Sequence, residues 1–262
     1  MPGHSSRFAG KYIIEENPVN GGVLYMKQYI PNQHGAWAML ILPFLFGIAS
    51  SAGKAIHIPL FICWLLIYLF SFPLLQGVKT GRFQRYAKPL KLYGLLLIPF
   101  AGYLVIAEPE LIWFVLPLLP LFAVNLYFAK RKNERALVND ISAIIAFSLI
   151  IYPVFYVGQG ESWRTATELF LLSALYFTGT ALYVKTIIRE RNNIRYYYVS
   201  VAYHLLLAAA GLLLFPSLLV PLLILLLRAA VLPKTGITAK RTGITEIFFS
   251  AMLYAGVLIL YF

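Results

Sequence analysis

The chain has 262 residues and a formal net charge of +12, although only 12% of its residues are charged and 60% are hydrophobic. Soluble domains carry about 25% charged residues, so this composition excludes an ordinary soluble domain. The single cysteine, Cys63, excludes an intrachain disulfide and a cysteine-based metal site. The basic excess fits short loops between membrane spans better than a nucleic-acid surface, so no nucleic-acid partner is expected.

Residues 1–28 are polar and lack the apolar core of a signal peptide, so they are predicted to form a cytoplasmic tail. Residues 29–262 are predicted to form one transmembrane domain, because runs of about 18 apolar residues recur along them. The fold class is therefore an all-α polytopic membrane protein with nine transmembrane helices. These are expected at residues 35–50, 56–75, 90–107, 111–129, 141–157, 169–188, 196–214, 217–232 and 244–262.

Lysine and arginine are concentrated in alternate connections between these spans. The connections on one side hold many of them, whereas the opposite connections hold only Lys54 and Arg164. Because basic loops remain in the cytoplasm, the amino end is predicted inside and Phe262 outside. The cations assigned to cytoplasmic connections include Lys79, Arg82, Arg85, Lys88, Lys130, Arg131, Lys132, Arg135, Lys185, Arg189, Arg191 and Arg228.

The first span opens with the polar side chains Asn32, Gln33 and His34. Pro31 disfavours helix before it, so the helix is expected to begin directly after the proline. One interpretation is a helix end capped by Asn32 with an interfacial histidine. The other is that His34 faces a cavity within the bundle, because the small Gly35 allows a neighbouring helix to approach closely.

Asn139 and Asp140 begin the fifth span on the same side. Asp140 is interpreted as a helix cap, as the partner of Lys185 or Arg189 in a salt bridge, or as an acid–base partner of His34. His204 lies inside the seventh span, where a hydrogen bond between helices is the expected role. The four histidines are scattered over different depths, so no metal site or cofactor is expected.

Two phrases resemble one bacterial family of membrane proteins. "PNQHGAWAMLILPF" resembles the opening of the YwiC-like proteins, and "LYVKTIIRERNN", residues 182–193, is also similar to that family. The resemblance implies a multi-pass protein of the bacterial inner membrane and implies little chemistry.

The layout also resembles the UbiA superfamily of membrane prenyltransferases. That resemblance implies a nine-helix bundle with functional loops after the second and sixth spans. "YFAKRKNERALVNDISAIIAF" looks like the phrase leading into that family's fifth helix, through Tyr127, Lys130 and Arg131. "GRFQRYAKPL" looks like the end of its first motif, with Lys88 and Pro89 where an arginine–proline pair is usual.

The aspartate-rich motifs of UbiA-type enzymes, which bind magnesium and a diphosphate, are missing here. Residues 17–107 contain no aspartate or glutamate. In "LYVKTIIRERNN", residues 182–193, Glu190 is the one acidic residue. Magnesium prefers carboxylate and phosphate oxygens, so a magnesium-dependent transfer is not expected. Lysine and arginine occupy those loops instead, and arginine can bind the phosphate or carboxylate head group of a ligand directly.

The expected function is therefore binding of an isoprenoid or other lipid-like molecule with an anionic head, in a UbiA-like cavity with the two basic loops at its rim. A metal-independent transferase is one form of this hypothesis. The alternatives are a transporter or assembly factor for a small anion or respiratory component, and cations that set topology or bind membrane lipids nonspecifically. The candidate binding residues are Asn32, Gln33, His34, Lys79, Arg82, Arg85, Lys130, Arg131, Asp140, Lys185 and Arg189.

Overall fold

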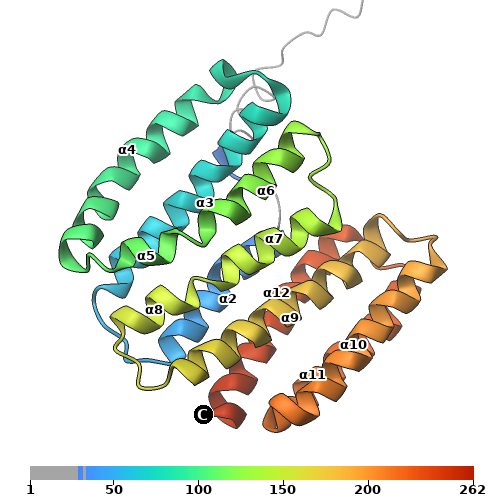
Figure 1. Ribbon diagram of the computed structural model, residues 1–262. Coiled ribbons are helices and arrows are strands. Elements are labelled where there is room, and N and C mark those ends of the chain that lie inside the picture. The colour runs from blue at the N-terminus through green and yellow to red at the C-terminus, as the bar shows by residue number, and fades with distance from the viewer. Residues whose placement is uncertain (1–28, 32–33) are drawn as a thin grey trace, which may run out of the picture.

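A computed structural model describes residues 29–31 and 34–262, and the predicted tail lies outside these residues. The described part is a bundle of helices in which successive long helices run antiparallel (Figure 1). The α-helices are α2 (His34–Ala49), α3 (His57–Thr80), α4 (Phe83–Ala107), α5 (Leu111–Val115), α6 (Leu118–Lys130), α7 (Leu137–Ser148), α8 (Ile151–Val157), α9 (Trp163–Ile188), α10 (Ile194–Leu214), α11 (Leu219–Val231) and α12 (Ala239–Gly256).

Among the described residues, eight helical segments are long and apolar enough to cross a membrane, and α2 is a shorter apolar helix. Two of the eight are each built from two consecutive helices, α5 with α6 and α7 with α8. The 3₁₀ turns Pro216–Leu218 and Leu232–Thr235 flank α11, and the π-helical turn Val257–Tyr261 follows α12. The predicted all-helical membrane fold is confirmed for the described part of the chain.

The short helix α2 lies at the centre of the bundle, where it packs against α7, α8, α9 and α12. Leu42 and Phe46 belong to an apolar core shared with α9 and α12. Leu40 and Phe44 belong to a second core shared with α3 and α8. A helix that is apolar on all sides is typically buried, which explains why this first span carries hydrophobic residues around its whole circumference.

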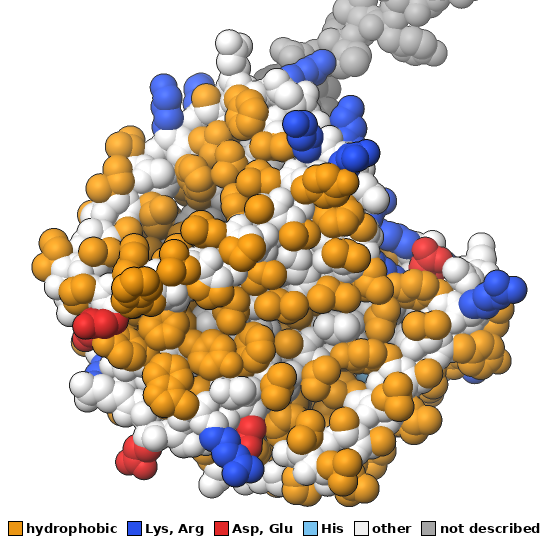
Figure 2. Space-filling view, viewed as in Figure 1, with side chains coloured by type: hydrophobic (Ala, Val, Ile, Leu, Met, Phe, Trp, Pro, Cys, Tyr) orange, Lys and Arg blue, Asp and Glu red, His pale blue; other side chains and the backbone are white. Residues whose placement is uncertain are grey.

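The basic loops gather at one end of the bundle, which we call the basic end. It holds the α3–α4, α6–α7, α9–α10 and α11–α12 connections. Figure 2 shows most of the visible Lys and Arg side chains along the upper and right rim, a broad hydrophobic surface below them, and most of the visible acidic side chains toward the opposite end, where a few basic side chains also lie. This distribution agrees with the alternation of charged connections in the sequence.

Several helices extend further into the basic connections than the hydropathy pattern predicts. Helix α3 continues to Thr80 and α4 begins at Phe83, so Lys79 and Arg85 lie on helices, separated by a two-residue connection. Helix α12 begins at Ala239 rather than at residue 244. Charged residues interrupt an apolar run without interrupting the backbone hydrogen bonds, so the apolar pattern marks the lipid-facing stretch and not the helix end.

The position of Arg228 is the largest difference between the structure and the interpretation of the sequence. This residue was assigned to a cytoplasmic connection, but it lies within α11 and its side chain is completely buried. Its guanidinium forms an ion pair with Glu246 of α12, which the sequence interpretation left unremarked. This pair lies inside the bundle, where both side chains are buried.

Candidate functional site

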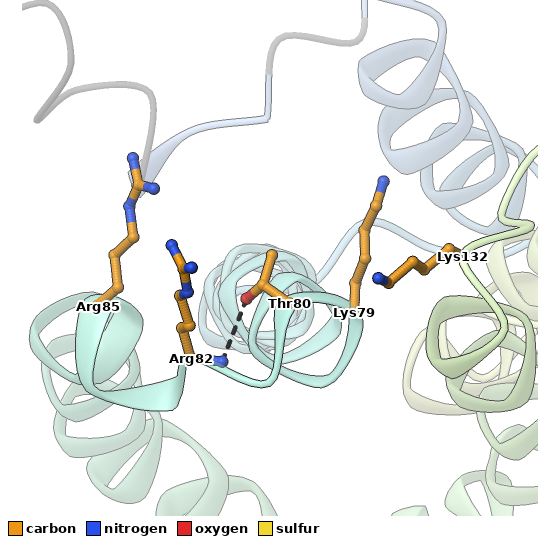
Figure 3. Close-up of a pocket in the computed structure, with 5 residues that line it drawn as sticks. All are labelled: Lys79, Thr80, Arg82, Arg85 and Lys132. Atoms are coloured by element: carbon orange, nitrogen blue, oxygen red, sulfur yellow. Dashed lines mark hydrogen bonds between the residues drawn. The ribbon is translucent and has the colours of Figure 1, made fainter.

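A pocket opens at the basic end between the end of α3 and the start of α4. Its volume is about 350 Å³. Lys79 and Thr80 come from α3, Arg82 from the two-residue connection, and Arg85 from the first turn of α4. Lys132 enters from the α6–α7 connection on the other side (Figure 3). We call these five residues the basic pocket.

The tight α3–α4 connection sets the direction of the pocket's arginines. Gly81 ends α3 with φ of +67°, a left-handed conformation that favours glycine, and its N–H donates to the Gly77 carbonyl. The Thr80 hydroxyl donates to the Gln76 carbonyl and accepts a 3.3 Å hydrogen bond from the Arg82 N–H. Because these contacts fix the turn, Arg82 and Arg85 project on the same side (Figure 3).

The charges of the basic pocket are only partly neutralised. Lys79 forms a 2.8 Å ion pair with Glu134 of the α6–α7 connection. Among the residues that the structure describes, no carboxylate forms an ion pair with Arg82, Arg85 or Lys132. Four cations with one carboxylate leave three positive charges around one opening, so the pocket favours an anion.

Lys132 was not among the predicted site residues, although it adjoins two that were. It has a positive φ of 55°, which is uncommon outside glycine and turns its side chain away from the preceding helix. Lys130 and Arg131 are exposed and do not line the pocket, and the Arg131 guanidinium lies 5.3 Å from the Tyr127 ring. No sequence pattern distinguishes the three adjacent cations, because the chain reversal alone selects the one that enters the pocket.

The predicted second rim of the cavity includes Lys185 and Arg189. Lys185 forms a 2.6 Å ion pair with Asp140 and donates a 3.1 Å hydrogen bond to the Arg135 carbonyl. Burial lowers the pKa of Arg189, and the neighbouring Arg135 guanidinium lowers it further. Neither Lys185 nor Arg189 lines the basic pocket, and the α6–α7 connection contacts both α3 and α9. The expectation that both basic loops face one cavity stays a prediction.

Asp140 resolves one of the alternatives left open by the sequence. Helix α7 begins after Ala136, whose side chain provides no cap, and Asp140 lies within the first turn of the helix. Its carboxylate pairs with Lys185, so the salt-bridge interpretation is confirmed and capping is not its role. Asn139 instead accepts a hydrogen bond of 3.0 Å from Asn125 of α6.

The polar triplet that opens the first span is only partly described. Asn32 and Gln33 lie outside the described residues, and His34 is described as the first residue of α2 without its side chain. A Cβ added at Gly35 would meet no atom of the described residues within 4 Å, so close helix packing at this glycine is not observed among them. The described helix begins at His34, and the predicted start directly after Pro31 falls on residues 32–33, outside the described residues.

Similarity to known proteins places the chain in a family. The family description "YwiC-like protein" matches residues 30–156. The YwiC protein of Bacillus subtilis (strain 168) is 44% identical over 181 residues, covering 69% of this chain and 76% of the relative. The chain belongs to the YwiC-like family. A Haemophilus influenzae relative of this YwiC-like protein is 34% identical over 234 residues, covering 87% of the chain and 97% of the relative.

The basic pocket lies within the segment that defines the YwiC-like match, since all five pocket residues fall between residues 30 and 156. The buried pair of Arg228 and Glu246 lies beyond that segment. No solved structure matches this YwiC-like chain. The likeness to the UbiA superfamily therefore stays a prediction.

Proposed function

We propose that this YwiC-like protein lies in the bacterial cytoplasmic membrane and binds, in its basic pocket, the anionic head of an isoprenoid or other lipid-like molecule. The observation that carries this proposal is the convergence of Arg82, Arg85 and Lys132 on one opening without carboxylate partners in the described part of the chain. The basic end faces the cytoplasm in this proposal, because lysine and arginine are retained on that side.

The surroundings of the pocket suit an amphipathic ligand. Helix α4 runs from the pocket across the apolar belt and exposes large aliphatic side chains, among them Leu95 at 68% and Ile98 at 67%. An acyl or prenyl chain lying along this surface remains in the hydrocarbon region while its head reaches the arginines. A free inorganic anion would use the same cations but gain nothing from α4.

Direct binding by cations removes the need for a metal bridge. Arginine presents a planar set of donors that fits phosphate and carboxylate groups bidentately, and hydrogen bonds to charged groups contribute about 1.5–3 kcal/mol. We propose binding rather than group transfer, because the Glu134 carboxylate beside the pocket is already engaged with Lys79. The transporter alternative draws its support from a different place, the buried charged residues Arg228 of α11 and Glu246 of α12.

Native mass spectrometry of the purified protein tests the proposal. We expect a retained lipid on the wild-type protein and its loss from the double variant Arg82→Gln/Arg85→Gln. The matched control is Arg191→Gln/Arg195→Gln, which removes the same charge from exposed positions of the basic end that do not line the pocket. Equal lipid retention by all three proteins would show that the pocket is a topological feature only.

A titration with farnesyl diphosphate tests the chemistry more closely. We expect binding to persist in the presence of a chelator and to weaken by about tenfold or more for each arginine removed. A strict requirement for magnesium would contradict direct recognition by arginine. Inorganic pyrophosphate serves as the comparison, and equal affinity for it would show that the apolar tail contributes nothing.

A further inference from the structure

A second group of charged residues lies inside the bundle, away from the basic pocket. The Nη1 atom of Arg228 on α11 is 2.7 Å from Oε2 of Glu246 on α12, and the two side chains are 0% and 3% exposed. Both residues belong to segments that are apolar enough to span a membrane. Ionisable groups at such depth are expensive, and a buried ion pair is weak evidence for stability alone.

The guanidinium of Arg228 has a second set of partners besides the carboxylate. Its central carbon lies 4.4 Å from the centre of the Tyr183 ring, 5.0 Å from that of Phe249 and 6.0 Å from that of Tyr176. Cation–π contacts of this kind gain strength where water is excluded. The arginine therefore keeps favourable surroundings for its charge when its contact with Glu246 is broken.

His204 of α10 completes the surroundings of the guanidinium. Its Nδ1 atom is 2.8 Å from the Ser200 carbonyl, which only accepts, so Nδ1 carries the hydrogen. The Nε2 atom then presents its lone pair to Nη2 of Arg228, 3.4 Å away. Gly179 leaves the space for this ring, since a Cβ there would come within 3.1 Å of Nε2. A proton on Nε2 would oppose the guanidinium, so Glu246 is the better proton acceptor of the two.

Polar atoms without partners surround the pair. Among the described residues, Arg228 Nε, Glu246 Oε1, Tyr183 Oη and Ser200 Oγ are buried and have no hydrogen-bond partner. An unsatisfied buried polar group costs about 1–3 kcal/mol, and folded proteins usually satisfy such groups with ordered water. Two of these atoms belong to the ion pair itself and two to the neighbouring helices α9 and α10, and together they indicate a hydrated site.

The polar residues continue from this site toward the basic end. On α10, Tyr196, Ser200 and His204 are spaced four residues apart and share one face, and the Tyr196 hydroxyl also lacks a partner among the described residues. On α12, the buried Thr242 precedes Glu246 by one turn. Glu246 lies about 10 Å along α12 from its first residue at the basic end, at 1.5 Å per residue.

We propose that Glu246 is a proton-exchanging carboxylate inside the membrane, reached by water along these polar faces from the basic end. Hydronium transfers its proton to the carboxylate and leaves as water, and the Oε2 contact with Arg228 breaks. The guanidinium keeps its charge against the Tyr183 and Phe249 rings and the lone pair of His204.

The groups around Glu246 support this assignment from each neighbouring helix. Tyr176 and Tyr183 face it from α9, Arg228 faces it from α11, and His204 of α10 reaches it through Arg228. The side chains that α2 contributes to the core shared with α12 are apolar. The site uses no residue of the basic pocket, so the proposal for Glu246 does not depend on the proposal of lipid binding.

Infrared difference spectroscopy between alkaline and acidic buffer tests the proton. We expect the carbonyl band of a protonated, buried carboxyl group from the wild-type protein and from the control Glu168→Gln, which alters a carboxylate near the start of α9, at the end of that helix opposite the basic end. The band is expected to be lost in Glu246→Gln. Absence of the band from the wild type, or its persistence in Glu246→Gln at full intensity, would overturn the proposal.

Hydroxyl-radical labelling of the wild-type protein tests the water and needs no variant to fold. Tyr183 and Phe46 are both completely buried rings, at 0% exposure each, but only Tyr183 lies in the proposed hydrated site. We expect Tyr183 to be labelled several-fold more than Phe46 after correction for intrinsic reactivity. Equal protection of the two rings would show that the site is dry, and the proposal would then be wrong.

Discussion

We expect removal of Arg228 from the buried ion pair to lower the unfolding free energy more than removal of Glu246. In the described part of the chain, the Glu246 carboxylate has Arg228 as its charged partner, and its Oε1 atom accepts no hydrogen bond. Arg228→Met strands this carboxylate in an apolar interior, and we expect a loss of about 3–5 kcal/mol of unfolding free energy. Glu246→Gln leaves the guanidinium with its aromatic rings, so we expect a smaller loss of about 1–3 kcal/mol.

The double variant Arg228→Met/Glu246→Gln gives the decisive comparison. It contains no stranded charge, so we expect it to be more stable than Arg228→Met alone, with a coupling free energy of about 1–3 kcal/mol. Reversible denaturant unfolding in mixed micelles measures all four proteins, in alkaline buffer so that the carboxylate remains ionised. If Glu246→Gln costs as much as Arg228→Met, or if the two losses simply add, the asymmetry argued from the ring contacts is refuted.

Three further predictions concern positions where the geometry sets the outcome. Lys185→Met is expected to cost about 1–2 kcal/mol, less than Arg228→Met, because the Asp140 side chain is 27% exposed and water screens it; a loss as large as that of Arg228→Met would contradict this. Gly179→Ala is expected to lower the melting temperature, since the added methyl group would meet Nε2 of His204 at 3.1 Å; an unchanged melting temperature would show that the imidazole moves aside freely. Gly81→Ala is expected to cost about 1 kcal/mol from its positive φ alone, since a Cβ there meets no atom within 4 Å, and a larger loss with altered lipid retention would indicate a rearranged pocket.

The sequence predicts the spans well because a membrane imposes a single strong pattern, a run of about 20 apolar residues. It also predicts the sides of the connections, since charge marks them independently of packing. The salt bridge between Asp140 and Lys185 was among the sequence alternatives because each lies near the same end of its span. These features depend on composition along the chain, and each can be evaluated one segment at a time.

The remaining features depend on contacts between segments. Arg228 resembles a loop cation because it lies three residues from the end of α11, and its partner Glu246 lies across a turn on another helix. A single acid within the apolar run of the last span was the available signal, and it would have identified Arg228 as the cation to pair with it. Lys132 enters the pocket only because the chain reverses there with a positive φ. The types of the neighbouring residues do not predict this backbone conformation.

The α6–α7 connection is anchored on two sides, by an ion pair from Glu134 to α3 and by a hydrogen bond from Lys185 of α9 to the Arg135 carbonyl. Glu134 within it reaches out to Lys79 at the end of α3, while Lys185 of α9 reaches in to Asp140 and to the Arg135 carbonyl. An anion that competes with Glu134 for Lys79 releases the first anchor and leaves the second in place. We expect the connection then to pivot about its attachment to α9, so that binding of an anion between α3 and α4 would reach α9 along the backbone of this connection.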